Sequence, residues 1–271
     1  MTMTGVSRPR DVARQIVVVL ALCAMLLCAW IGVGGLGGTP IQDAQGGALA
    51  ADATYLAPAG PAFSIWTVIY VGLAGYAVWQ VLPSQRASRR QRALGWWITL
   101  TMLLNGLWLL AVQFLQIWWT VVVIVVLLAA LCVAFQRAVA TRLPGDGVWD
   151  SVLIDGVTGL HLGWVAVATV ANVAAWLTEI GPDRWGAYST VAGLGALAVV
   201  LIVGLVLAWR SGWRVTPGLA LMWGLVWIGI GRLVLQPRDT AIGWTAIAVG
   251  VVVAAVPLVV TGLRPREPEH D

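Results

Sequence analysis

Eight long apolar runs, separated by short polar joints, restrict what this chain can fold into. A helix that crosses a bilayer needs about 20 mostly apolar residues. The runs lie at about 15–37, 62–82, 93–116, 118–140, 152–177, 187–209, 214–235 and 241–263. They are continuous and do not alternate with a period of two, which argues against the strands of a membrane barrel. We predict an all-α, polytopic helical membrane bundle of about eight transmembrane helices.

Composition supports this class of protein and excludes others. Hydrophobic residues make up 60% of the chain and charged residues only 10%, too few to cover a soluble surface. The three cysteines lie inside apolar runs, so we interpret them as packing residues and not as a disulfide framework. All basic residues are arginines placed at the joints between runs. This distribution indicates membrane topology and argues against nucleic-acid binding.

Arginine placement also predicts orientation, because cytoplasmic segments of membrane proteins are enriched in basic residues. With the N-terminus in the cytoplasm, 13 of the 16 basic residues fall on the inner side. Both termini are then cytoplasmic, with tails at 1–14 and 264–271, and segment 38–61 is an external loop. The expected setting is a bacterial-type plasma membrane. The first run is longer than the core of a signal peptide, so we expect an uncleaved span.

Tryptophan is unusually frequent, with 17 residues against 4 Tyr and 3 Phe. Most lie near predicted helix ends, as in the aromatic belt of membrane proteins. Trp108 and Trp164 lie deep within spans 3 and 5, where an indole packs between helices or lines a cavity. Helical spacing places each on a stripe of polar residues. These stripes are Trp97, Thr101, Asn105, Trp108 and Val112 on span 3, and Asp155, Thr158, His161, Trp164, Ala168, Asn172 and Trp176 on span 5.

The buried polar residues allow more than one interpretation. Asn105 and Asn172 should face the bundle interior, where an amide bonding across helices contributes about 1 kcal/mol. His161 is expected to be an interior histidine and not a metal ligand, because the other histidine is in the tail, so we predict no metal site. Asp155 lies near the cytoplasmic end, either simply hydrated or forming a proton path with His161.

Three motifs resemble the TspO/MBR family, the tryptophan-rich sensory proteins related to the mitochondrial translocator protein. Residues 57–70, APAGPAFSIWTVIY, resemble the Pro-rich loop and "VWTxLY" helix start of that family. Residues 105–108, NGLW, are similar to its "LNxxW", and residues 163–176 resemble its "AWxxFAxxLNxxxW" fifth helix. The resemblance covers about residues 15–178, which would form a five-helix unit.

The resemblance implies a pocket among spans 1, 2, 3 and 5 beneath the first loop, accepting a planar hydrophobic ligand such as a porphyrin, haem or a sterol. Trp66 and Trp164 match the two tryptophans that face each other in the family's pocket. The full set of ligand-binding residues implied is Trp66, Tyr70, Asn105, Trp108, His161, Trp164, Ala168, Asn172 and Trp176, with Pro58, Pro61 and Phe63 in the loop above. Indole faces suit a planar macrocycle, and amides suit its polar edge.

Spans 6–8, at 179–263, have no counterpart in the five-helix unit, so their role stays open. Trp223, Trp227 and Arg232 on span 7 are placed to contact the core or a partner, although we expect Arg232 to snorkel to the outer surface. Small-residue patterns such as Gly193-Leu194-Gly195 permit close helix contacts within one chain or in a homodimer.

The leading hypothesis is a membrane sensor or carrier, with lipid and a small hydrophobic ligand as partners and no required cofactor. Three alternatives remain. One is a proton-coupled secondary transporter using Asp155 and His161, and another is a scaffold subunit without a ligand. The third is an enzyme that breaks down porphyrin at the matched tryptophans, which ranks below simple binding because the sequence shows no activated nucleophile.

Overall fold

The computed structural model describes residues 7–263 of the chain. Within that range, eight helices are long and apolar enough to cross a membrane, and no strand is present. The helices are α1 (Pro9–Gly32), α2 (Ile65–Val81), α4 (Arg89–Phe114), α5 (Ile117–Thr141), α6 (Val157–Ile180), α7 (Ser189–Arg210), α8 (Thr216–Val234) and α9 (Thr240–Leu263), with a short α3 (Pro83–Arg86) after α2. The predicted all-α membrane bundle is confirmed.

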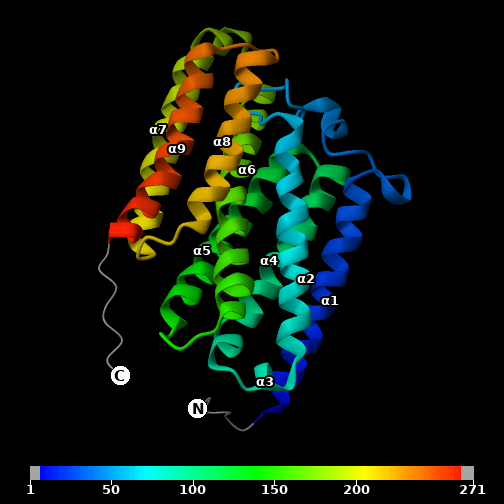
Figure 1. Cartoon of the computed structure of the whole chain (residues 1–271). Coiled ribbons are helices and arrows are strands. Elements are labelled where there is room, and N and C mark those ends of the chain that lie inside the picture. Colours follow the sequence, from blue (N-terminus) through cyan, green and yellow to red (C-terminus); the bar gives the residue numbers. More distant parts are fainter. Residues whose placement is uncertain (1–6, 264–271) are drawn as a thin grey trace.

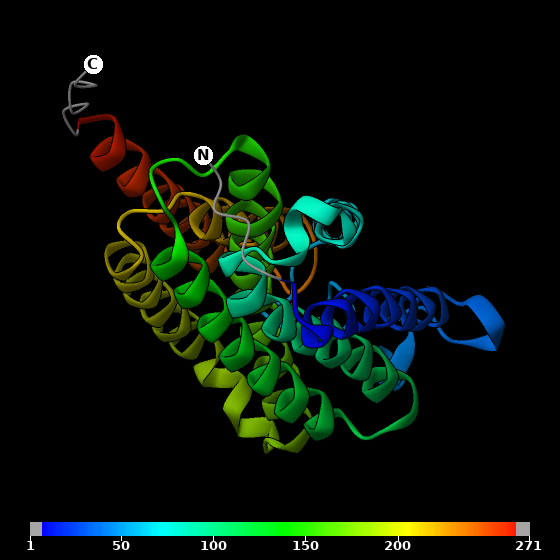
Figure 2. The ribbon, with the colours of Figure 1, turned by 90° about the horizontal axis from the view of Figure 1, so that it is seen from below.

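Consecutive long helices run in opposite directions, so the chain passes up and down the bundle (Figure 1). Helix α1 packs on α2 and α4, α4 on α5, and α5 on α6, which also contacts α2. Helix α6 then packs on α8, and α9 contacts both α8 and α7. Seen along the bundle, α1 lies at one edge and α7 and α9 at the opposite edge (Figure 2). Helix α6 therefore joins the five-helix unit to the three C-terminal helices.

Glycines allow α6 and α8 to approach closely. A Cβ built on Gly163 of α6 would lie 2.9 Å from the Cβ of Ala220 on α8. A Cβ on Gly224 of α8 would lie 2.8 Å from a methyl group of Val167 on α6. Real side chains do not come this near, so these two positions require glycine for the observed helix spacing.

The small-residue pattern on α7 is also used within the chain. A Cβ on Gly193 would meet the side chain of Ile242 on α9 at 2.7 Å, whereas a Cβ on Gly195 would meet nothing within 4 Å. The contact at Gly193 is thus intramolecular.

Helix α1 starts six residues earlier than the predicted span, at Pro9 instead of residue 15. Asp11 accounts for the difference, because its carboxylate accepts a hydrogen bond from the backbone N–H of Arg8, 2.9 Å away. The same carboxylate pairs with Arg92 of α4 at 2.7 Å. Polar residues of the predicted tail are therefore held in the bundle as the first helical turns. The turn between spans 3 and 4 is tight, since α4 ends at Phe114 and α5 starts at Ile117.

A buried ionic network lies at the end of the bundle away from the 38–61 loop. Asp155 belongs to a π-helical turn (Asp150–Gly156) that leads into α6. One of its oxygens accepts from Arg90, 2.6 Å away, and the other pairs with Arg142. Arg90 is also 3.2 Å from Asp150. The interpretation of Asp155 as a simply hydrated group is wrong, because it is buried and holds two arginines from the ends of neighbouring spans.

Candidate functional site

Two adjoining hollows lie at the loop end of the five-helix unit. An inner cavity of about 30 Å³ lies between α4, α6 and the 38–61 loop, and has room for about one or two water molecules. A wider groove of about 480 Å³ lies between α1 and α2 at their ends next to the 38–61 loop. Ile41, Phe63 and Trp66 line both hollows and so form the partition between them.

Aromatic rings build this partition. The rings of Trp66 on α2 and Trp164 on α6 meet edge to face, with centroids 6.0 Å apart and an interplanar angle of 87°. Phe63 meets Trp164 in the same way at 5.9 Å. On its groove side Trp66 stacks on Tyr70 at 5.2 Å. Such offset and edge-to-face arrangements are the favoured geometries of aromatic pairs. Trp66 therefore stands between a buried aromatic cluster and the open groove.

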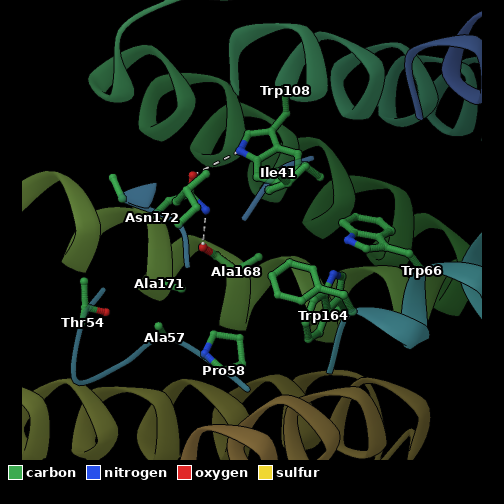
Figure 3. Close-up of a pocket in the computed structure, with 13 residues that line it drawn as sticks. Ile41, Thr54, Ala57, Pro58, Trp66, Trp108, Trp164, Ala168, Ala171 and Asn172 are labelled. Carbon is green, nitrogen blue, oxygen red and sulfur yellow. Dashed lines mark hydrogen bonds between the residues drawn. The ribbon is translucent and has the colours of Figure 1, made fainter. Parts of the chain in front are cut away.

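One amide connects α4 to α6 at the inner cavity. Trp108 Nε1 donates a hydrogen bond to Asn172 Oδ1 at 3.2 Å, and Asn172 Nδ2 donates to the carbonyl oxygen of Ala168 at 2.8 Å (Figure 3). All three residues line the cavity. The buried Asn and Trp thus satisfy each other, and they fix the separation of the two helices.

A second polar chain lies next to the groove. The hydroxyl of Tyr70 donates to Asn105 Oδ1 at 3.1 Å. Asn105 Nδ2 lies 3.5 Å from His161 Nε2, and the His161 ring is 5.8 Å from that of Trp66. Asn105 and His161 are buried and line neither hollow. Although they do not line the hollows, they contact Tyr70 and Trp66 and so orient these two side chains.

The lining carries no formal charge. Neither hollow is lined by an Asp, Glu, Arg or His among the described residues. Trp164 Nε1 is buried and has no hydrogen-bond acceptor in the described part of the chain. It is a buried donor at the cavity that the described part of the chain leaves available. The walls therefore suit an uncharged, flat surface, and charged substituents would have to remain at the open mouth of the groove.

The fit to a porphyrin or haem differs between the two hollows. The groove has the volume of a typical small-molecule site, about 300–1,000 Å³, whereas the inner cavity is far smaller. A flat macrocycle suits the Trp66 and Tyr70 faces. Among the described residues, the lining of the two hollows contains no cysteine or histidine, and the hydroxyl of Tyr70 donates to Asn105, so the lining suits the ring system better than it suits an iron.

Most predicted site residues converge at this place. Trp66, Trp108, Trp164, Ala168, Asn172, Pro58 and Phe63 line the cavity, and Tyr70 lines the groove. Trp176 and Pro61 line neither. Trp176 belongs to the predicted stripe of Trp164 only through three successive steps of four residues. Each such step turns the helix by about 40° beyond a full turn, so Trp176 lies about 120° away from Trp164.

The resemblance implies a pocket bordered by span 1 and the first loop, but it does not name the residues of α1 and of segment 38–57 that form its walls. Ile41, Leu49, Thr54 and Ala57 supply much of the cavity wall, and Trp30 lines the groove. Loop residues follow no helical or strand period that could have indicated their position. Trp30 lies near a predicted helix end, which indicates the aromatic belt, and its 54% exposure is compatible with a place in the belt and in the groove.

Arg232 of α8 requires a correction. It was expected to snorkel to the outer surface, but its side chain is fully buried. Its Nη2 donates to the carbonyl oxygen of Ala51 in the loop at 2.6 Å, and its Nη1 donates to that of Pro237 at 2.9 Å. Backbone carbonyls replace water as acceptors, which is how a buried guanidinium in a membrane protein is accommodated.

Fold and hollow together define a polytopic membrane protein with an aromatic-lined hollow under the 38–61 loop. The family model described as "TSPO-like protein" matches residues 14–259, so the chain belongs to the TSPO-like family. Membership indicates a general role as a membrane sensor or ligand-binding protein. No curated protein and no solved structure matches the chain. The match runs well past residue 178, where the motif resemblance ends, and includes most of the three C-terminal helices.

Proposed function

We propose that this protein is a membrane sensor or carrier that binds a planar hydrophobic molecule, of the porphyrin, haem or sterol-like kind. The observation that carries the proposal is the position of Trp66, which presents an aromatic face to a groove of about 480 Å³ while its ring contacts Trp164. Flat apolar ligands gain from stacking on such faces and from leaving the lipid or water around them.

The same position indicates how the two hollows would work together. The groove has room for a ring system, and the cavity behind Trp66 offers the free Trp164 N–H and little space. A ligand in the groove would stack on Trp66 and Tyr70. A hydrogen-bond acceptor at its edge would reach Trp164 only if Trp66 or Phe63 moved aside.

A titration tests the proposal. The purified protein in lipid nanodiscs is titrated with protoporphyrin and, separately, with a fluorescent sterol, following quenching of tryptophan fluorescence and the ligand's absorbance shift. We expect saturable binding that is lost in the Trp66→Ala, Trp164→Ala double variant. Trp209→Ala, Trp244→Ala is the matched control, because these indoles are 63% and 64% exposed and lie on α7 and α9. Equal quenching in the wild type and the pocket variant would contradict the proposal.

Binding without turnover is part of the proposal. Illumination of the protoporphyrin complex should yield no absorbing product that free protoporphyrin does not also yield. A product that requires Trp66 and Trp164 would instead indicate an enzyme acting on porphyrin.

The proposed orientation places both ends of the chain in the cytoplasm of a bacterial-type plasma membrane. The N-terminal end of α1, the joint around α3 and the C-terminal end of α5 carry most of the arginines of the chain and lie at one end of the bundle (Figure 1). Cysteine accessibility labelling of single residues in the 38–61 loop and in the 142–149 joint tests this. Labelling of the joint from outside intact cells would reverse the orientation.

A further inference from the structure

A short loop segment, residues 54–59, forms a wall of the candidate site, and α8 covers the side of this segment that faces away from the cavity. Thr54, Ala57 and Pro58 line the inner cavity. On the other side, Leu56 is buried in the apolar cluster that includes Leu225 and Ile228 of α8. Figure 3 shows the trace through Thr54, Ala57 and Pro58 passing between α6 and the helices of the C-terminal unit. The wall segment is therefore sandwiched between the cavity and α8.

Three hydrogen bonds from α8 hold this loop and the start of the helix that follows it. Trp223 Nε1 donates to the carbonyl oxygen of Ala62 at 2.9 Å. The backbone N–H of Ala59 donates to the carbonyl oxygen of Trp227 at 3.2 Å. Nη2 of the buried Arg232 donates to the carbonyl oxygen of Ala51 at 2.6 Å. Trp223 and Trp227 are four residues apart and share one side of α8. Arg232, five residues further on, lies about 140° around the helix from Trp227 and reaches the loop through its long side chain.

Gly231, the residue next to Arg232, faces the backbone of the loop. A Cβ built on Gly231 would lie 3.6 Å from the backbone nitrogen of Ala59 and 3.8 Å from the carbonyl oxygen of Ala57. The loop backbone thus lies directly against the α8 backbone. Loops of this kind are ordinarily exposed and mobile, whereas here Leu56–Ala59 is buried without interruption.

The position of α8 is in turn fixed by α6, the helix that carries Trp164 and Asn172. The close contacts at Gly163 and Gly224 fix the distance between the two helices. Helix α8 therefore fixes the position of the wall segment relative to the α6 residues that line the same cavity.

We infer that α8 is a positioning element of the ligand site. Arg232 and Trp223 hold the loop at Ala51 and Ala62, on either side of the wall segment and next to Phe63, which lines both hollows, and this hold limits how fast a ligand bound in the groove is released. This inference rests on the proposed function and gives the C-terminal helices a role in it. The wall segment moves only when its bonds to α8 break. Weakening these bonds loosens one wall of the cavity without touching Trp66 or Trp164.

Two variants of the full chain test the inference. Trp223→Phe removes the indole donor and keeps an aromatic ring against Trp227, and Arg232→Leu removes the guanidinium. The first readout is hydrogen exchange of the backbone amides of residues 54–62 in ligand-free protein in nanodiscs. We expect exchange about tenfold faster in both variants, the effect of losing about one hydrogen bond. Trp244→Phe, an exposed indole on α9, should leave exchange unchanged.

The second readout is the rate at which protoporphyrin dissociates, measured by stopped-flow dilution. Release should accelerate in both α8 variants and not in Trp244→Phe, while the thermal midpoint of Trp223→Phe stays near that of the wild type. Unchanged exchange in folded variants overturns the inference, and so does faster exchange without faster release. If Arg232→Leu does not fold, Trp223→Phe decides alone. Failure of protoporphyrin to bind the wild type contradicts the proposed function, and the exchange experiment then decides whether α8 holds the wall.

Discussion

Trp66 and Trp164 come from helices far apart in the sequence, yet their rings meet almost at a right angle, with 6.0 Å between centroids. Trp164 is buried and Trp66 is partly exposed to the groove. Their contact closes the inner cavity from the wider space, so the two residues should be coupled both in stability and in ligand binding.

A double-mutant cycle measures this coupling. Trp66→Leu and Trp164→Leu should each destabilise the protein, and the double variant should be less destabilised than the sum by about 0.5–1.5 kcal/mol, the interaction of one aromatic pair. Unfolding by urea in mild detergent, followed by circular dichroism, gives the free energies. Strict additivity would mean that the rings do not interact.

The Trp108–Asn172 bond predicts a rescue. Asn172→Leu removes the acceptor and leaves the Trp108 N–H without a partner in the bundle, which should cost about 1–3 kcal/mol. Adding Trp108→Phe removes the orphaned donor and should restore part of the loss. Thermal unfolding of the two single variants and the double variant checks this. A double variant less stable than Asn172→Leu alone would argue that the bond contributes little.

The glycine contact between α6 and α8 predicts a sharp difference between two alanine variants. Gly163→Ala places a methyl group against the α8 backbone and should destabilise the protein by about 1–3 kcal/mol, as overpacking does. Gly195→Ala on α7 meets nothing within 4 Å and should be neutral. Differential scanning fluorimetry on both proteins in one buffer makes the comparison. Equal thermal midpoints would contradict the observed helix spacing.

The ionic network predicts that Asp155 is structural. Asp155→Asn leaves Arg90 and Arg142 short of a counter-charge, and breaking a buried pair costs about 3–5 kcal/mol. Asp146→Asn is the matched control, because its carboxylate lies 3.5 Å from Arg90 and is more exposed, so a smaller loss is expected. Unfolding free energies of the two variants test the ranking.

The same network bears on the transporter alternative. A carboxylate that binds and releases protons during transport needs a state in which it is free of its arginines, and here both oxygens of Asp155 are engaged. Ligand uptake into proteoliposomes should therefore be insensitive to a pH gradient. Uptake driven by the gradient and abolished by Asp155→Asn would favour the transporter.

Spans and their order could be predicted from the sequence because continuous apolar length is a strong and local signal. The inward orientation of Trp108, Trp164 and Asn172 could be predicted for a different reason, because a polar group that faces lipid is costly. Helix starts were less accurate, because Asp11 and Arg14 find partners on other helices that the sequence does not reveal.

Contacts made by irregular or distant segments could not be predicted. Leu56 enters the C-terminal core from a loop, and Arg232 finds its acceptors at Ala51 and Pro237. Neither contact follows a periodic pattern in the sequence from which it could be predicted. Trp176 shows the limit of periodicity itself, because a stripe extended by successive steps of four drifts around the helix.

The groove between α1 and α2 has a practical consequence for how this protein is handled. Its rim includes Trp30 and Val33, which are 54% and 70% exposed, and its walls carry no charge to repel a hydrocarbon chain. Detergent tails can therefore occupy the same space as a lipophilic guest and compete with it. Affinities measured in micelles should be weaker than those measured in bilayers, and should fall further as the detergent concentration rises.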